Sequence, residues 1–171
     1  MNSTHLSENE YAPFYAGYIK SLGTTDLLPA LENSYDELFN LVKDLNEEQL
    51  NYRYEPGKWT IKEILQHIMD AERVLSYRAL RFSRNDTTEI PGFDEDWYVD
   101  NSNGNDRKFQ IMLNEFGHIR QSTFTLFTSF TDEMLRMTGS ANKSLMSVRA
   151  LGFVIAGHQL HHTRIIAERY L

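Results

Sequence analysis

The chain has 171 residues, no cysteine and a formal net charge of −7, and its basic residues are scattered along the sequence. Without cysteine, disulfide bonds, zinc–thiolate sites and nucleophilic catalysis by a protein thiol are excluded, so any metal must be held by imidazole or oxygen ligands. The acidic balance argues against a nucleic acid or an anionic membrane as the partner.

The length and the N-terminal sequence predict one domain in the cytoplasm. A chain of this size can bury a core of its own, and we expect residues 1–171 to form a single domain whose first part, 1–20, is partly flexible. Residues 1–15 lack the basic start and apolar run of a signal peptide. No apolar stretch approaches the roughly 18 residues that would span a bilayer.

The first long helix is predicted over residues 25–45. Apolar side chains recur there with spacings of three and four, which is typical of an amphipathic helix. These residues are Leu28, Leu31, Tyr35, Leu38, Val42 and Leu45. A short helical turn is expected at 46–50, because Asn46 can cap it while Gln49 reaches back to the cap.

The second helix has the clearest start in the sequence. Thr60 and Glu63 have the spacing of a capping box, and Trp59 before the cap can pack onto Ile64 one turn later. We expect this helix to run to about Phe82. The inward side chains are predicted to be Ile64, His67, Ala71 and Val74.

The segment 83–105 breaks the helical pattern with polar residues and a Pro-Gly pair. A loop of this length inside a domain is unusual unless it serves a function, so we interpret it as a candidate lid or wall of a site. Asp94, Glu95 and Trp97 are candidates for shaping or covering a pocket there. The alternatives are a plain crossover between distant helices and a solvated acidic turn anchored by one buried tryptophan.

Two further helices complete the pattern. The third is predicted from the stripe Phe109, Met112, Phe116, Ile119, Leu126 and Phe130. A helical turn at 131–137 and a polar loop at 138–146 then lead to a fourth helix, capped by Ser147 and running to about Tyr170. Because no segment shows the alternation expected of strands, the fold class is all-α, a four-helix bundle with a long connection between helices two and three.

The fourth helix carries an unusual cluster of histidines. Its apolar seam can be written Val148, Leu151, Ile155, His158, His162 and Ile165, with alternating spacings of three and four. His158 and His162 therefore occupy core positions. His161 lies about 60° from His158, on the flank of the seam, and is either a supporting group behind a site or simply exposed.

Histidines four residues apart on one helix face can bind the same ion, and His67 lies on the inward line of the second helix. Three inward imidazoles suit an open metal site that leaves positions for water and substrate. The alternative is a structural bundle whose core histidines are hydrogen-bonded. Burying them without partners would cost about 1–3 kcal/mol each, and a shared cation removes that cost.

Other candidate chemistry is weaker. Glu115 and His118 make one Glu-x-x-His spacing, but a di-iron bundle needs a second such pair. His5 lies in the N-terminal segment. A Gly-x-Ser-x-Gly elbow, a Gly-rich phosphate loop and a dinucleotide fingerprint are all missing. Arg149 and Arg164 are candidates for meeting an anionic substrate.

The order WTIKEILQH, IPGFDEDWY and GHQLHHTRII resembles the DinB/YfiT-like superfamily of metal-dependent enzymes, over nearly the whole chain. The resemblance implies a four-helix bundle of up-down-down-up topology that binds a divalent metal, commonly nickel or zinc, through three histidines. Carried over to this sequence, the metal ligands are His67, His158 and His162. Homodimers are common in the superfamily.

The resemblance also implies a reaction. Members with assigned chemistry join a low-molecular-weight thiol such as bacillithiol, mycothiol or glutathione to an electrophile. We therefore expect a transferase with a small electrophile and a thiol as its partners. The alternatives are a metal-dependent hydrolase, with Asp70 or Glu63 as general base, and a non-enzymatic bundle that binds a metal or ligand in a stress response.

Overall fold

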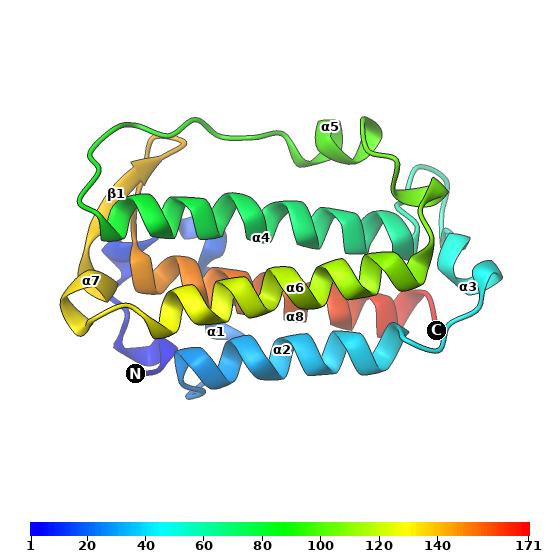
Figure 1. The fold of residues 1–171 in the computed structure, drawn as a ribbon, viewed down its shortest axis with the longest axis horizontal. Helices are drawn as coiled ribbons and strands as arrows, with labels where there is room; N and C mark the ends of the chain where they lie inside the picture. The colour runs from blue at the N-terminus through cyan, green and yellow to red at the C-terminus, as the bar shows by residue number, and fades with distance from the viewer.

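The computed structural model describes residues 1–171 and contains four long helices that lie side by side (Figure 1). They begin and end close to the predicted positions. The four are α2 (Leu27–Val42), α4 (Ile61–Ser83), α6 (Phe109–Thr128) and α8 (Val148–Arg169). The prediction of a four-helix bundle is confirmed.

The bundle has up-down-down-up topology. In Figure 1, α2 and α8 run in one direction, and α4 and α6 run in the other. Because α4 and α6 are parallel, the chain between them must return along the full length of the bundle, which explains the long connection. That connection contains two short helices, α5 (Glu95–Asp100) and η4 (Gly104–Asp106).

Side-chain caps fix several helix starts where the sequence predicts them. The Thr60 hydroxyl accepts a hydrogen bond from the Glu63 amide, and the Glu63 carboxylate accepts one from the Thr60 amide at 2.7 Å. Asn46 and Gln49 form the same reciprocal pair at α3 (Glu47–Asn51). Ser147 caps α8 by accepting from the Ala150 amide. These caps satisfy amide donors that the helices cannot pair internally.

One part of the predicted secondary structure is wrong. The segment expected to be a polar loop is a hairpin of β1 (Thr138–Ala141) and β2 (Ser144–Ser147), which follows the predicted helical turn α7 (Asp132–Arg136). Asn142 and Lys143 both have positive φ, at 52° and 60°, as a two-residue hairpin turn of type I′ requires. Strands of four residues are too short for an alternating pattern to stand out in the sequence.

The N-terminal residues pack against the bundle. They form η1 (Ser3–His5), η2 (Glu8–Glu10), η3 (Pro13–Tyr15) and α1 (Ala16–Lys20). The backbone of Tyr18 approaches α8 so closely at Gly157 that a Cβ atom there would clash with the Tyr18 carbonyl.

None of the helices in the protein combines the length and the apolar composition that crossing a membrane needs.

The apolar core consists of two clusters that contact α8 on either side of its histidines. One cluster includes α8 residues from Val148 to Ala156, and the other includes Ile166 and Tyr170. His158 and His162 lie between these two segments. The bundle therefore buries a polar band in the middle of its last helix.

Candidate metal centre

Three imidazoles from two helices converge inside the bundle. The Nε2 atom of His158 lies 2.9 Å from Nε2 of His67, on α4, and 3.1 Å from Nε2 of His162, one turn along α8. One nitrogen from each ring lies within 4.8 Å of the others, and all three residues are buried. The structure thus brings together the three histidines selected from the helix seams.

The spacing of the three nitrogens fits a shared ion. With metal–nitrogen bonds of about 2.0–2.1 Å, two imidazoles separated by 90° at the metal have nitrogens about 2.9 Å apart, and two in a tetrahedral arrangement about 3.4 Å apart. The Nε2–Nε2 distances from His158 to His67 and to His162, 2.9 and 3.1 Å, fall in that range. A donor set of three imidazole nitrogens is able to bind several divalent first-row metals.

Burial keeps the rings uncharged. It lowers the pKa of His67 from 6.5 to about 4. Burial also lowers the pKa of His158 and of His162 well below the usual value, and the neighbouring imidazoles add to the effect. At neutral pH all three rings are therefore neutral, which is the form that binds a metal.

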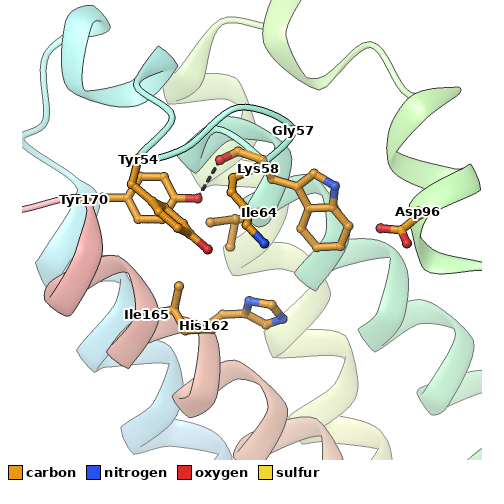
Figure 2. A pocket seen from close by; sticks show the side chains of 9 residues that line it. Tyr54, Gly57, Lys58, Ile64, Asp96, His162, Ile165 and Tyr170 are labelled. Carbon is orange, nitrogen blue, oxygen red and sulfur yellow. Dashed lines mark hydrogen bonds between the residues drawn. The ribbon is translucent and has the colours of Figure 1, made fainter.

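A pocket of about 400 Å³ opens beside the cluster, and we call it the His162 pocket (Figure 2). It is lined by Tyr54, Gly57, Lys58, Trp59, Ile64, Asp96, His162, Ile165 and Tyr170. In Figure 2 the Lys58 side chain extends toward the His162 ring. The Trp59 ring lies 4.8 Å from the His67 ring, and the Tyr170 hydroxyl donates to the Trp59 carbonyl at 2.6 Å. One wall is thus an indole in contact with the histidines.

The other side of the cluster is covered by Tyr18. Its ring lies 5.4 Å from the ring of His158 and 5.3 Å from that of His161, between centroids. Burial, followed by the charge of Glu95, raises the pKa of Tyr18. His161 is exposed and is not one of the three clustered histidines, and its ring centroid lies 5.2 Å from that of His162, at the flank that the helix geometry predicts.

The two carboxylates considered as general bases are engaged elsewhere. Asp70 accepts two hydrogen bonds from the Gln66 amide, at 3.0 and 3.1 Å. Burial alone would raise the pKa of Glu63, but hydrogen bonds from the Thr60 amide and from Arg53 outweigh it and lower the pKa. Neither carboxylate makes a hydrogen bond to the histidine cluster.

The loop residues are arranged differently from the expectation. The Asp94 carboxylate caps α5 by accepting from the Trp97 amide at 2.9 Å. Trp97 is 65% exposed, so the alternative of a buried tryptophan anchor is wrong. The loop does reach the His162 pocket, but through Asp96.

Arg149 lies at the other end of α8. Its guanidinium pairs with the Glu10 carboxylate, at 2.6 and 2.7 Å, and so ties the N-terminal segment to the bundle. It precedes His158 by nine residues, which places it about 13 Å away along the helix axis. Arg164 is exposed. The structure therefore gives Arg149 a partner within the protein.

Sequence reasoning missed most of the pocket wall. Lys58, Tyr54 and Tyr170 carry no motif, and Trp59 was interpreted only as a packing residue before a helix cap. Their grouping depends on the connection before α4 meeting the end of α8, a contact across more than a hundred residues. The only local signal is the aromatic content of the connection at 52–59.

A sequence profile of the DinB superfamily matches residues 30–166, which include all of α4 and α6 and most of α2 and α8. The chain belongs to the DinB superfamily. This DinB-superfamily chain is 26% identical over 138 residues to a protein of Geobacillus thermodenitrificans named "Putative metal-dependent hydrolase", covering 80% of this chain and 78% of that protein. A protein of Oceanobacillus iheyensis with the same description is 27% identical over 73 residues, or 42% of each chain.

The fold of the DinB-superfamily chain is also that of a solved structure. YfiT from Bacillus subtilis superposes with a TM-score of 0.73 at 19% identity, over 83% of this chain and 82% of that one. YfiT is described as a "probable metal-dependent hydrolase with an unusual four-helix bundle topology". The likeness confirms the DinB/YfiT-like bundle that the sequence resemblance implied.

Proposed function

We propose that the protein is a metal-dependent enzyme that binds one divalent ion, nickel or zinc, through His67, His158 and His162. The observation that carries the proposal is the convergence of three buried, neutral imidazole nitrogens on one point. Three protein ligands leave coordination positions open, as catalytic sites do. The description of the relatives as metal-dependent proteins supports the same conclusion.

A divalent ion in such a site lowers the pKa of a bound thiol or water and so supplies a nucleophile at neutral pH. The protein's own residues provide the surroundings. The Trp59 ring and the Tyr170 side chain form one wall of the His162 pocket, and a hydrogen bond holds them together. Lys58 brings an ammonium group toward His162, where it can stabilise negative charge that develops on an electrophile.

The proposed reaction is transfer of a low-molecular-weight thiol to a small electrophile. The nucleophilic sulfur forms a bond to carbon, the electrophile's leaving group departs with the bonding electrons, and the thiol proton passes to solvent. Thiol transfer is favoured because Asp70 and Glu63 are both held by other partners. A thiol, whose ordinary pKa is near 8.5, needs less help from a general base than water does.

Hydrolysis is the second candidate, and the descriptions of the relatives favour it. In that reaction water replaces the thiol as nucleophile in the same pocket. Lys58, on the pocket wall, is then the side chain best placed to orient or protonate the departing group. A third possibility, a binding bundle without catalysis, differs from both because it retains the metal but turns nothing over.

The metal is tested first. We expect purified, tag-free protein to contain about one equivalent of divalent metal by elemental analysis, and a His158→Ala, His162→Ala variant to contain none. His118→Ala is the matched control, because His118 is exposed on α6. If the metal-free protein takes up neither nickel nor zinc, the proposal fails.

The reaction is tested next with the metal-loaded protein. Bacillithiol, mycothiol or glutathione is offered with 1-chloro-2,4-dinitrobenzene, and the thioether product is identified by mass. Hydrolysis of p-nitrophenyl acetate without thiol forms the second arm. Turnover only with thiol supports the transferase, and turnover only without it overturns that choice in favour of the hydrolase. Metal binding without either reaction at any pH would favour the binding bundle.

A further inference from the structure

One buried arginine side chain in the protein has no counter-charge. Arg78, on α4, is 2% exposed, yet no carboxylate lies within ion-pair distance of its guanidinium. One of its terminal nitrogens donates to the Pro91 carbonyl at 3.2 Å, and its Nε atom has no hydrogen-bond partner. Leaving a buried charge without an opposite charge is costly, so the site calls for an anion.

Arg120, the other deeply buried arginine, has a complete set of partners and serves as a comparison. Arg120, 4% exposed, donates from two nitrogens to the Glu72 carboxylate at 2.9 and 2.8 Å. It also donates to the Ser34 hydroxyl at 2.9 Å and to the Leu31 carbonyl. Every side of that guanidinium is matched within the fold. Arg78 differs because its partners are incomplete.

Arg78 lines a pocket of about 400 Å³, which we call the Arg78 pocket. Its lining also includes Asp94, Glu95 and Asp96, which we call the acidic rim. No residue of the rim forms an ion pair within the protein. Partial burial of the Glu95 carboxyl, followed by the charges of Asp96 and Asp94, raises the pKa of Glu95, as expected for crowded like charges.

The lining of the Arg78 pocket therefore combines one cation with three carboxylates, and none of the four residues forms an ion pair within the protein. Tyr15 lines the same pocket, and burial is the largest cause of its raised pKa, while the charge of Arg78 lowers that pKa and the charge of Glu95 raises it. Phe14 and Phe93 add apolar surface to the lining. A simple anion would satisfy Arg78 but would be repelled by the acidic rim.

We propose that the Arg78 pocket binds the zwitterionic end of an amino acid or of a small molecule that contains one. The carboxylate lies on the Arg78 guanidinium, the ammonium lies at the acidic rim, and an apolar substituent packs against the aromatic residues. This arrangement matches both kinds of charge with one ligand. It goes beyond the proposed function and does not depend on a metal, although Asp96 borders the His162 pocket as well.

The binding test uses the full-length, metal-free protein and three matched probes. L-norleucine carries both charges, hexanoate lacks the ammonium, and pentylamine lacks the carboxylate. In isothermal titration calorimetry we expect norleucine to bind saturably and each analogue to bind at least about tenfold more weakly, as the loss of one charged hydrogen-bond partner predicts. No saturable norleucine binding, or hexanoate binding equally well, would overturn the proposal.

Variants assign the two ends of the ligand. Arg78→Gln is expected to weaken norleucine and hexanoate, and Glu95→Gln to weaken norleucine and pentylamine but not hexanoate. Arg84→Gln, an exposed change at the end of the same helix, is the control and leaves all three unchanged. If Arg78→Gln fails to fold by circular dichroism, the Glu95→Gln pattern decides the matter, because that residue is on the surface. A Glu95→Gln protein that binds all three probes like the parent contradicts the proposal.

A direct readout distinguishes contact from a general effect on the fold. The Nε–H signal of Arg78 in ¹⁵N NMR is expected to shift on addition of norleucine and to be missing in Arg78→Lys. An Arg78 signal that does not move at saturating norleucine would show that the ligand lies elsewhere.

Discussion

His67 and His158 are 91 residues apart in the sequence, and their Nε2 atoms lie 2.9 Å apart across the α4–α8 interface. Two neutral imidazoles can share at most one proton at that distance, and His162 approaches His158 as well. A cation satisfies all three nitrogens at once. The relationship between these two helices is thus what makes the cluster a candidate metal site.

Removing one ligand tests this relationship. We expect His67→Ala to weaken nickel or zinc binding by more than about a hundredfold, since even residues behind the ligands commonly contribute ten- to a hundredfold. Titration of metal-free protein with either ion, followed by calorimetry, measures the change. His161→Ala, on the exposed flank, is the control and should bind as the parent does. Equal affinity in both variants would show that His67 is not a ligand.

The buried histidines predict a loss of stability in acid. Unfolded His67 titrates near pH 6.5 and the folded form at about 4, so the stabilising effect of its neutral ring is complete above 6.5 and is lost as the pH falls toward 4. For His67 alone the free energy of unfolding should fall by about 2–3 kcal/mol between pH 7.5 and 4.5. Urea unfolding of the metal-free protein measures this.

The control for the pH experiment is a variant that lacks the titrating group. His67→Asn should show a pH dependence that is shallower than that of the parent by about the same 2–3 kcal/mol. An identical pH dependence in the two proteins would mean that His67 is not shielded from water in the folded state.

The ion pair between Arg120 and Glu72 should contribute strongly to specifying the packing of α6 on α4. Glu72→Gln leaves the Arg120 charge buried without its partner and is expected to lower the free energy of unfolding by about 3–5 kcal/mol. Arg73→Gln, which breaks an ion pair with Glu115 at the surface, should change it by no more than about 1 kcal/mol. Similar decreases in the free energy of unfolding for Glu72→Gln and Arg73→Gln would contradict this prediction.

Gly157 is expected to be needed for the contact between α8 and the N-terminal segment. Gly157→Ala forces a Cβ atom against the Tyr18 carbonyl and should destabilise the protein by about 1–3 kcal/mol. Limited proteolysis should then cut the first 20 residues faster. Gly17→Ala is the control, because nothing lies near its added Cβ atom and alanine favours the α1 helix. Equal melting temperatures for the two variants would show that the close contact between Gly157 and Tyr18 does not limit stability.

Local signals explain what could be predicted from the sequence. The Thr60 and Glu63 capping box needs only four consecutive residues, and the seam through His158 and His162 needs only the helical repeat. Both lie within one element, so spacing alone identifies them. His67 could be added because the second helix has an equally clear inward line.

Features that depend on contacts between distant segments could not be predicted. The position of Tyr18 over His158, the Arg149 pair with Glu10 and the grouping of Lys58 with His162 are set by packing, which leaves no periodic trace. The β1–β2 hairpin was missed for a different reason. Its strands have four residues each, and half of these residues are serine or threonine, so little in the sequence separates them from a loop.

The contact between Trp59 and His67 makes tryptophan fluorescence an intrinsic probe of the histidine cluster. The sequence has two tryptophans, and the other, Trp97, is 65% exposed. In a Trp97→Phe protein all indole fluorescence would come from a ring 4.8 Å from one imidazole of the cluster and 6.5 Å from another. Paramagnetic nickel should quench that emission and zinc should only shift it, so one intrinsic signal reports both the occupancy of the site and the identity of the ion.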